Sequence, residues 1–415
     1  MTAASPTDRP GNIGVIKALT YLMFMMFAMT TDSVGVIIPR VIEEFDLGMT
    51  AAGSFHYATM SGIALAGLML GFLADSLGRK RAIILGLALF AATAFLFAVG
   101  QSFGFFVMLL FLSGAAIGVF KTAALALIGD ISTSTRSHTA TMNTVEGFFG
   151  VGAIVGPAVV AALLASGASW KWLYVIAGVL AVLLIATASA VRYPRPVLGQ
   201  QKPADLKATL AMMSNPYALA FSLGTMLYVG VETAIYVWMP TLLADYRGPA
   251  ILIATYALSI FFVLRAAGRF LGAWLLGRFA WTTVLVVCSL AILICFAGAL
   301  AGGRGAAVWL LPLSGLFMSV IYPTLNSKGI SCFPKVQHGA VAGVILFFTC
   351  VSAVVSPLAM GAVSDAFGGA QYGFVLATGF ALVLFLALLL NRLFDPAAAR
   401  LAVNDDREYE VGSAG

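Results

Sequence analysis

Long apolar stretches separated by short polar turns dominate the sequence. Each stretch holds about 20 residues, the length that an α-helix needs to cross the hydrocarbon core of a bilayer. The pattern predicts about twelve membrane-spanning helices, six in each half of the chain. Their expected positions are Val15–Pro39, Ala51–Ala74, Arg81–Val99, Phe103–Gly129, Thr139–Ala165, Trp170–Val191, Tyr217–Pro240, Ile251–Leu276, Trp281–Leu300, Ala306–Leu325, Gly339–Ser364 and Tyr372–Leu390.

A polar, proline-containing stretch at 192–215 separates the two sets of helices. We therefore predict an all-α membrane protein built from two six-helix pseudo-repeats, at 15–191 and 216–392. The stretch 192–215 is expected to be a cytoplasmic linker, with a cytoplasmic N-terminus at 1–14 and a cytoplasmic tail at 393–415. Two equal halves of this kind are typical of parallel-repeat transporters.

The basic residues indicate how the helices are oriented. Arginine and lysine gather in the turns that share a face with both chain ends, as at Arg79, Lys80 and Arg81, and few lie on the other face. Basic residues resist translocation, so both termini are expected in the cytoplasm. The first apolar segment is too long for the core of a signal peptide. We expect a multi-pass protein of the cell inner membrane.

The composition narrows the function classes. Of the residues, 61% are hydrophobic and 10% are charged, whereas soluble domains carry about a quarter charged residues. The net charge of +6 resides in short turns rather than on one face, which argues against nucleic acid as a partner. Three separated histidines, unclustered cysteines and no phosphate-binding glycine loop predict no enzyme activity, no metal and no cofactor.

The turn after the second expected helix carries a motif. Its glycines allow close helix approach and a tight reversal, and its acid can accept hydrogen bonds from a helix N-terminus. The motif consists of Gly71, Asp75, Gly78, Arg79, Lys80 and Arg81, and a degenerate copy containing Gly268 and Arg269 follows the eighth helix. It resembles the cytoplasmic loop motif of the major facilitator superfamily, which implies a gating role. The alternative is that the basic residues only fix the topology.

Three further stretches resemble the fucose, galactose and glucose proton symporters of that superfamily, at Asn143–Pro157, Tyr228–Pro240 and Gly315–Asn326. The resemblance implies a monomer that moves a small polar solute, a sugar or sugar acid, by proton-coupled symport. Gly152, Gly156 and Pro157 also overlap a motif of antiporters. The alternatives are therefore a proton-coupled exporter of drugs or metabolites and, more distantly, a non-transporting solute sensor.

Ionisable residues inside the expected helices are costly in lipid and normally face a cavity with a partner. They are Asp32, Lys121, Glu146, Glu232 and Arg265. The family resemblance implies proton coupling by a first-helix carboxylate near Asp32. For Asp32 the alternative is a structural salt bridge. We add Glu146 and Glu232 as candidates for proton coupling, and Arg265 could either pair with Glu232 or meet an anionic substrate.

Polar and aromatic residues near these charges are the candidates for binding the solute. Asn143 shares a helix face with Glu146, and Tyr228 and Tyr236 flank Glu232 at helical spacing. Trp238, Tyr322 and Asn326 complete the set with Arg265 and Lys121; Pro323 should interrupt the tenth helix. The aromatic residues are alternatively an interfacial belt. Lys121 has three possible roles: it could form a structural ion pair, act as a proton-linked switch or anchor a substrate carboxylate.

Overall fold

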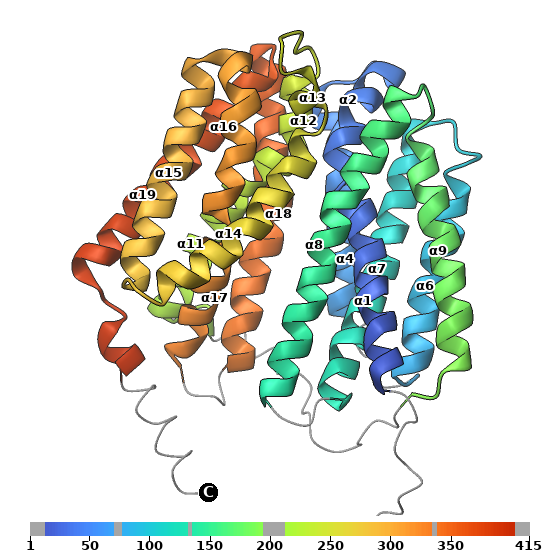
Figure 1. Ribbon diagram of the computed structural model, residues 1–415, viewed down its shortest axis with the longest axis horizontal. Helices are drawn as coiled ribbons and strands as arrows, with labels where there is room; N and C mark the ends of the chain where they lie inside the picture. Colours follow the sequence, from blue (N-terminus) through green and yellow to red (C-terminus); the bar gives the residue numbers. More distant parts are fainter. Residues whose placement is uncertain (1–12, 70–76, 132–134, 194–211, 334–337, 403–415) are drawn as a thin grey trace, which may run out of the picture. The chain divides into compact units, whose positions relative to one another are not determined.

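The computed structural model describes residues 13–69, 77–131, 135–193, 212–333 and 338–402, and the regular structure in these ranges is helical (Figure 1). Within them, ten helical segments are long and apolar enough to cross a membrane. The shorter helices α4 and α6 occupy the positions of the second and third predicted segments. The predicted all-α, multi-pass membrane fold is confirmed.

The chain separates into two compact units by its internal contacts. The first unit comprises residues 1–46 and 54–200, and the second comprises Leu47–Gly53 and residues 201–415. The predicted domain boundaries stay a prediction, because most of the linker and the chain ends lie outside the described residues. The helices of the first unit run side by side (Figure 1): α1 Ile13–Thr31, α2 Val34–Phe45, α4 Ser54–Met69, α6 Arg79–Leu96, α7 Phe103–Ile131, α8 Thr135–Ala165 and α9 Lys171–Ala190.

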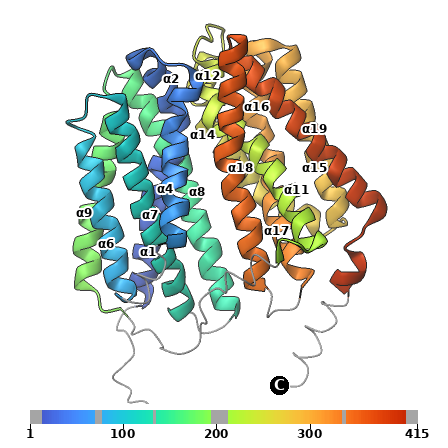
Figure 2. The same cartoon turned by 180° about the vertical axis from the view of Figure 1, so that it is seen from behind.

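The second unit repeats this plan and contains the short helix α3, Met49–Ala52, as well. Helix α11 lies beside α18 in this unit (Figure 2). The other elements are α11 Pro216–Thr233, the π-helix η2 Ala234–Trp238, α12 Met239–Leu243, α13 Ile251–Thr255, α14 Ala257–Leu276, α15 Trp281–Ala301, α16 Gly303–Met318, α17 Ile321–Ser331, α18 His338–Phe367 and α19 Ala370–Phe394.

Glycine lets several helices touch backbone to backbone. A Cβ atom added at Gly152 or Gly156 of α8 would collide with the carbonyl oxygens of Met25 and Met29 on α1. In lipid, apolar side chains gain little by associating with one another, so close backbone contact between small residues supplies much of the packing. The two glycines therefore hold α8 against the part of α1 that leads to Asp32.

The first membrane-spanning segment is interrupted at Asp32, because α1 ends at Thr31 and α2 begins at Val34. The hydroxyls of Thr30 and Thr31 both donate to the carbonyl of Phe27, and the Ser33 hydroxyl donates to the carbonyl of Met29. Such back-bonding competes with the helical backbone hydrogen bonds and bends helices. Three such hydroxyls lie within four residues at the break that carries the Asp32 carboxylate.

Two segments of the second unit are interrupted next to prolines. Helix α11 passes into η2 at Ala234, and η2 ends at Trp238, two residues before Pro240. Helix α16 ends at Met318, before Pro323. Proline has no N–H to donate to the carbonyl four residues earlier, so the backbone near Tyr236 and Ser319 leaves the regular pattern. The predicted interruption at Pro323 is confirmed, whereas the π-helical turn after Glu232 was not anticipated.

An internal repeat links the two units. Gly152, Gly156 and Pro157 of α8 recur as Ser352, Ser356 and Pro357 of α18, with residue numbers 200 higher. Helix α8 packs on α1, and α18 packs on α11. Ser352 donates to the carbonyl of Met226 at 2.6 Å.

The packing relation in the repeat is therefore the same in both units. Where glycine at position 152 approaches Met25, serine at position 352 binds the carbonyl of Met226. The same offset relates Asp32 to Glu232, and each acid stands beside an interruption in the first helix of its unit. The two carboxylates are equivalent positions of the repeat.

The segment Leu47–Gly53 packs with the second unit although its chain neighbours belong to the first. The carboxylate of Asp365, at the end of α18, accepts hydrogen bonds from the backbone N–H groups of Met49 at 2.7 Å and Thr50 at 2.8 Å. These are the first N–H groups of α3, which have no partner within the helix. Asp365 therefore holds α3 on the end of α18.

We expect Asp365→Ala to loosen this segment. Loss of a capping acceptor costs about 1 kcal/mol, or about fivefold in a local opening equilibrium. Hydrogen–deuterium exchange of Leu47–Gly53, followed by mass spectrometry, should accelerate by about that factor. Glu43→Ala, which removes an exposed acid of α2 that pairs with Arg40 across one helical turn, is the control. Equal exchange in both variants would mean that the cap does not hold the segment.

Candidate functional site

Asp32 occupies the turn between α1 and α2 and is half-buried. One of its carboxylate oxygens, Oδ2, accepts a hydrogen bond from the Thr31 hydroxyl at 2.8 Å. The same hydroxyl lies 3.2 Å from the carbonyl oxygen of Phe27, a second possible acceptor. Thr31 therefore has two alternative acceptors, one of which changes its charge when Asp32 takes up a proton.

Lys121, Asn143 and Glu146 lie on α7 and α8 of the first unit. The Lys121 ammonium lies 5.0 Å from the centre of the Phe149 ring, within the range of a cation–π interaction. Glu146 is exposed on α8, and the side chain of Asn143 lies outside the described residues. The three hypotheses for Lys121 therefore stay predictions, and the ring of Phe149 is an additional contact that the sequence did not indicate.

The second unit brings together three of the predicted site residues around one carboxylate oxygen. Arg265 Nη2 on α14 lies 2.7 Å from Glu232 Oε1, and the Tyr228 hydroxyl donates to the same oxygen at 2.8 Å. The Glu232 side chain is 9% exposed and that of Arg265 is 23% exposed. Of the two alternatives for Arg265, the structure shows pairing with Glu232, and the helical spacing correctly placed Tyr228 beside the acid.

Tyr322 on α17 extends this cluster, and Asn326 lies one helical turn further along α17. The rings of Tyr322 and Tyr228 have centres 6.2 Å apart. Among the described residues, the buried Oδ1 atom of Asn326 has no hydrogen-bond partner. An unsatisfied buried carbonyl is costly and often marks a place that a ligand or water fills. The cluster thus combines aromatic faces, a charged pair and an available acceptor.

Tyr236 and Trp238 lie in η2, so the regular four-residue spacing assumed from Glu232 to Tyr236 does not continue through this turn. Tyr236 is half-buried. Trp238 is 1% exposed, and its indole N–H donates to the carbonyl of Pro357 on α18 at 3.0 Å. In this conformation Trp238 fixes η2 to α18, and its solute-binding role stays a prediction.

The loop motif is described only in part, because Gly71 and Asp75 lie outside the described residues. Gly78 has a φ of 81°, a left-handed conformation that favours glycine and allows the predicted reversal. Lys80 donates to the carbonyls of Ser189 and Val191 at 2.7 and 2.8 Å, where a cation complements the C-terminal end of α9.

The remaining motif residues occupy different environments. Arg79 is buried, whereas Arg81 and, in the second copy, Arg269 are exposed. A Cβ atom at Gly268 would collide with the carbonyl of Leu316, so this glycine sets the approach of α14 to α16. The gating role of the motif stays a prediction.

Sequence reasoning missed the serines of α18 that bind or face α11, Ser352 and Ser356. The repeat of Gly152, Gly156 and Pro157 at an offset of 200 was a signal that could have found them. It also missed Thr59, Ser113 and Tyr174, whose side chains line a small cavity together with Thr31. Those residues come from different helices and share no spacing that a single sequence displays.

Comparisons with known proteins agree with this architecture. A family model described as Major Facilitator Superfamily matches residues 20–357. The L-fucose-proton symporter of Escherichia coli (strain K12) is 26% identical over 393 residues, covering 85% of this chain and 87% of the symporter. A glucose/galactose transporter of Brucella abortus biovar 1 (strain 9-941) is 24% identical over 392 residues, covering 89% of this chain and 94% of the transporter. A crystal structure of the nucleoside transporter NupG superposes with a TM-score of 0.74 at 15% identity, covering 90% of this chain and 97% of NupG.

Proposed function

Because the chain belongs to the major facilitator superfamily, we propose that it is a secondary active transporter that carries a sugar or sugar acid together with protons. Two relatives support this choice of solute and coupling ion, because one is named an L-fucose-proton symporter and the other a glucose/galactose transporter. The single structural observation that carries it is a carboxylate beside a helix break in each unit, Asp32 and Glu232. Discontinuous membrane helices commonly carry the ion and substrate sites of secondary transporters.

Asp32 is the proposed site of proton binding. It lies between α1 and α2 within the candidate membrane span Ile13–Phe45, where its carboxylate accepts a hydrogen bond from the Thr31 hydroxyl. A carboxylate that exchanges a proton during the cycle needs a neighbour that can bind both forms. The Thr31 hydroxyl satisfies this need, because it donates to an ionised Asp32 or turns to Phe27 and accepts from a protonated one.

The Glu232 cluster is the proposed contact for the sugar in the second unit. Sugars present hydroxyl groups at the rim of a ring whose faces are partly apolar, so they suit a site of charged hydrogen-bonding groups beside aromatic rings. Glu232, Arg265 and Asn326 supply acceptors and donors, and Tyr228 and Tyr322 supply rings. Glu146 and Asn143 are the corresponding proposal for the first unit.

The protein is proposed to reside in the cell inner membrane as a monomer with both termini in the cytoplasm. The distribution of arginine and lysine in the turns supports this orientation. The proposal needs no cofactor or metal, since the energy comes from the proton gradient.

Uptake by purified protein in proteoliposomes tests the function. Labelled hexoses and hexuronates are offered with and without an imposed pH gradient, inside alkaline. Accumulation above equilibrium only with the gradient is the expected result. Proton-driven efflux of lipophilic cations without sugar uptake would instead favour the exporter, whose motif overlaps Gly152, Gly156 and Pro157. Binding of sugar without any flux would favour the solute sensor.

Lys121 is the residue that tests the charge of the solute. If its ammonium binds a substrate carboxylate, Lys121→Gln should weaken affinity for a hexuronate by about tenfold or more and affinity for the matching neutral hexose much less. Competition binding of the two sugars measures the ratio. Lys171→Gln is a matched control, because Lys171 is also a half-buried lysine above an aromatic ring, that of Phe106 at 4.8 Å. Equal losses for both sugars would favour the structural ion pair.

A further inference from the structure

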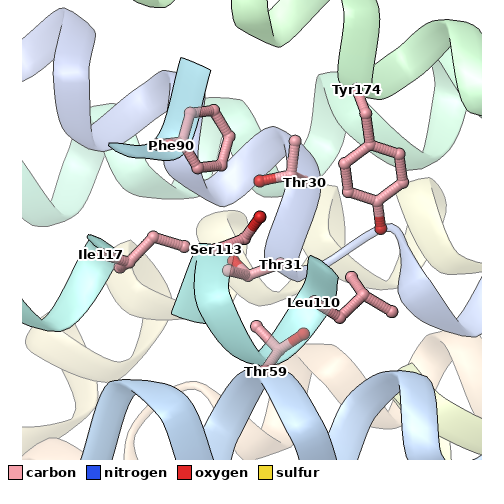
Figure 3. A pocket seen from close by; sticks show the side chains of 8 residues that line it. All are labelled: Thr30, Thr31, Thr59, Phe90, Leu110, Ser113, Ile117 and Tyr174. Carbon is pink, nitrogen blue, oxygen red and sulfur yellow. The ribbon is translucent and has the colours of Figure 1, made fainter. Parts of the chain in front are cut away.

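A small cavity lies among five helices of the first unit, one residue from Asp32 (Figure 3). Hydroxyl-bearing residues of α1, α4, α7 and α9 line it together with apolar side chains. Its lining consists of Thr30, Thr31, Thr59, Phe90, Leu110, Ser113, Ile117 and Tyr174. Among these lining residues, only Thr31 belongs to the candidate sites described above, through its hydrogen bond to Asp32.

The hydroxyl groups that line the cavity differ in whether they already have a hydrogen-bond partner. Thr30 and Thr59 each donate to a carbonyl of their own helix, those of Phe27 and Phe55, at 2.9 Å. Their oxygen atoms retain lone pairs that can accept a further hydrogen bond. The Tyr174 hydroxyl is the exception: the ring is 1% exposed, and within the described part of the chain its oxygen has no hydrogen-bond partner.

Tyr174 therefore presents a buried donor to a space bordered by acceptors. Figure 3 shows its ring entering from α9 with the hydroxyl at the inner end and the threonines and Ser113 around it. The cavity measures about 10 Å³ for the centre of a water-sized sphere. A single buried water needs about 10–15 Å³ on this measure and two to four polar partners.

We propose that this cavity binds one structural water molecule, which accepts a hydrogen bond from Tyr174 and donates to two of the threonine hydroxyls, one of which is that of Thr31. Thr31 donates in turn to Asp32 at 2.8 Å, so a role of this water in proton coupling rests on the proposed function of Asp32. The resulting chain runs from Tyr174 through water and Thr31 to the carboxylate. Each hydrogen bond in such a chain polarises the next. Tyr174 and Thr31 are thus positioning residues for the coupling carboxylate.

Thermal stability tests the water itself, independently of transport. If water satisfies Tyr174, then Tyr174→Phe and Thr59→Val each lower the melting temperature of the purified protein by about 2–4 °C. The double variant loses less than the sum, because both changes remove the same water. Tyr372→Phe, at an exposed tyrosine of α19, is the control and changes little. A rise in melting temperature for Tyr174→Phe would overturn the proposal, since it would mean that the hydroxyl is buried without water.

Transport tests the link to Asp32. Thr31→Val and Tyr174→Phe should lower pH-gradient-driven uptake several-fold more than sugar exchange at equal pH on both sides. Thr31→Ser, which keeps the hydroxyl, should restore driven uptake. Equal loss of driven uptake and exchange would mean that Thr31 and Tyr174 only pack the helices, and it would overturn the link to Asp32. The melting temperatures of the single and double variants would still decide whether the cavity holds water. If Asp32→Asn itself leaves driven uptake intact, the coupling role of Asp32 fails, and the link fails with it.

Discussion

Asp32→Asn should reduce pH-gradient-driven sugar accumulation to the level reached without a gradient, while sugar exchange across the membrane persists in part. Asparagine has nearly the shape of aspartate and can still accept the hydrogen bond that the Thr31 hydroxyl donates. It cannot take up and release a proton. The change therefore separates proton binding from the conformational change, which depends on the relative stability of the protein's states.

Two assays on the same proteoliposomes measure this result. Accumulation of labelled sugar is followed under an imposed pH gradient, and counterflow of labelled against unlabelled sugar is followed at equal pH. Glu43→Gln is the control: this acid lies on α2 near Asp32 in sequence, and its side chain is 65% exposed in a pair with Arg40. Loss of both activities in Asp32→Asn would indicate a structural aspartate, and retention of both would move the coupling role to Glu146 or Glu232.

The fold could be predicted because helix length and polarity in a membrane are constrained locally. A helix must be about 20 residues long and apolar wherever it crosses the hydrocarbon core, so each segment is visible without knowledge of its neighbours. The predicted segment Phe103–Gly129, for example, became α7, Phe103–Ile131. The pairing of Tyr228, Glu232 and Arg265 was accessible in part, since spacing along one helix fixes the first two.

The features that escaped prediction depend on contacts between helices or on competing backbone hydrogen bonds. The sequence displays Thr30, Thr31 and Ser33, but it does not show which backbone acceptors their hydroxyls bind at the break beside Asp32. The sequence likewise shows Pro240 but not the π-helical turn at Ala234–Trp238 that precedes it. Tyr174 joins Thr31 and Thr59 from a separate helix, and no single-sequence pattern relates positions so far apart.

We expect Glu232→Gln to lower the stability of the protein more than Asp32→Asn does. The variant removes the carboxylate that lies 2.7 Å from Arg265 and accepts from Tyr228. Removing one partner of a largely buried ion pair costs about 3–5 kcal/mol, because the remaining charge loses its compensation in a poorly solvated place. We expect a large fall in the melting temperature and in the amount of protein recovered, together with loss of sugar binding.

The double variant Glu232→Leu with Arg265→Met separates the structural from the functional part of this loss. Apolar residues of similar volume can replace a buried pair at little cost or even with a gain, so stability should recover while sugar binding, measured by calorimetry, stays absent. Asp245→Asn is the control, because its pair with Arg304 spans 3.4 Å and is exposed; its effect should stay below about 1 kcal/mol. Normal sugar binding by the stable double variant would show that the cluster only holds α11 to α14, and the sugar site would then have to be sought around Glu146 and Lys121.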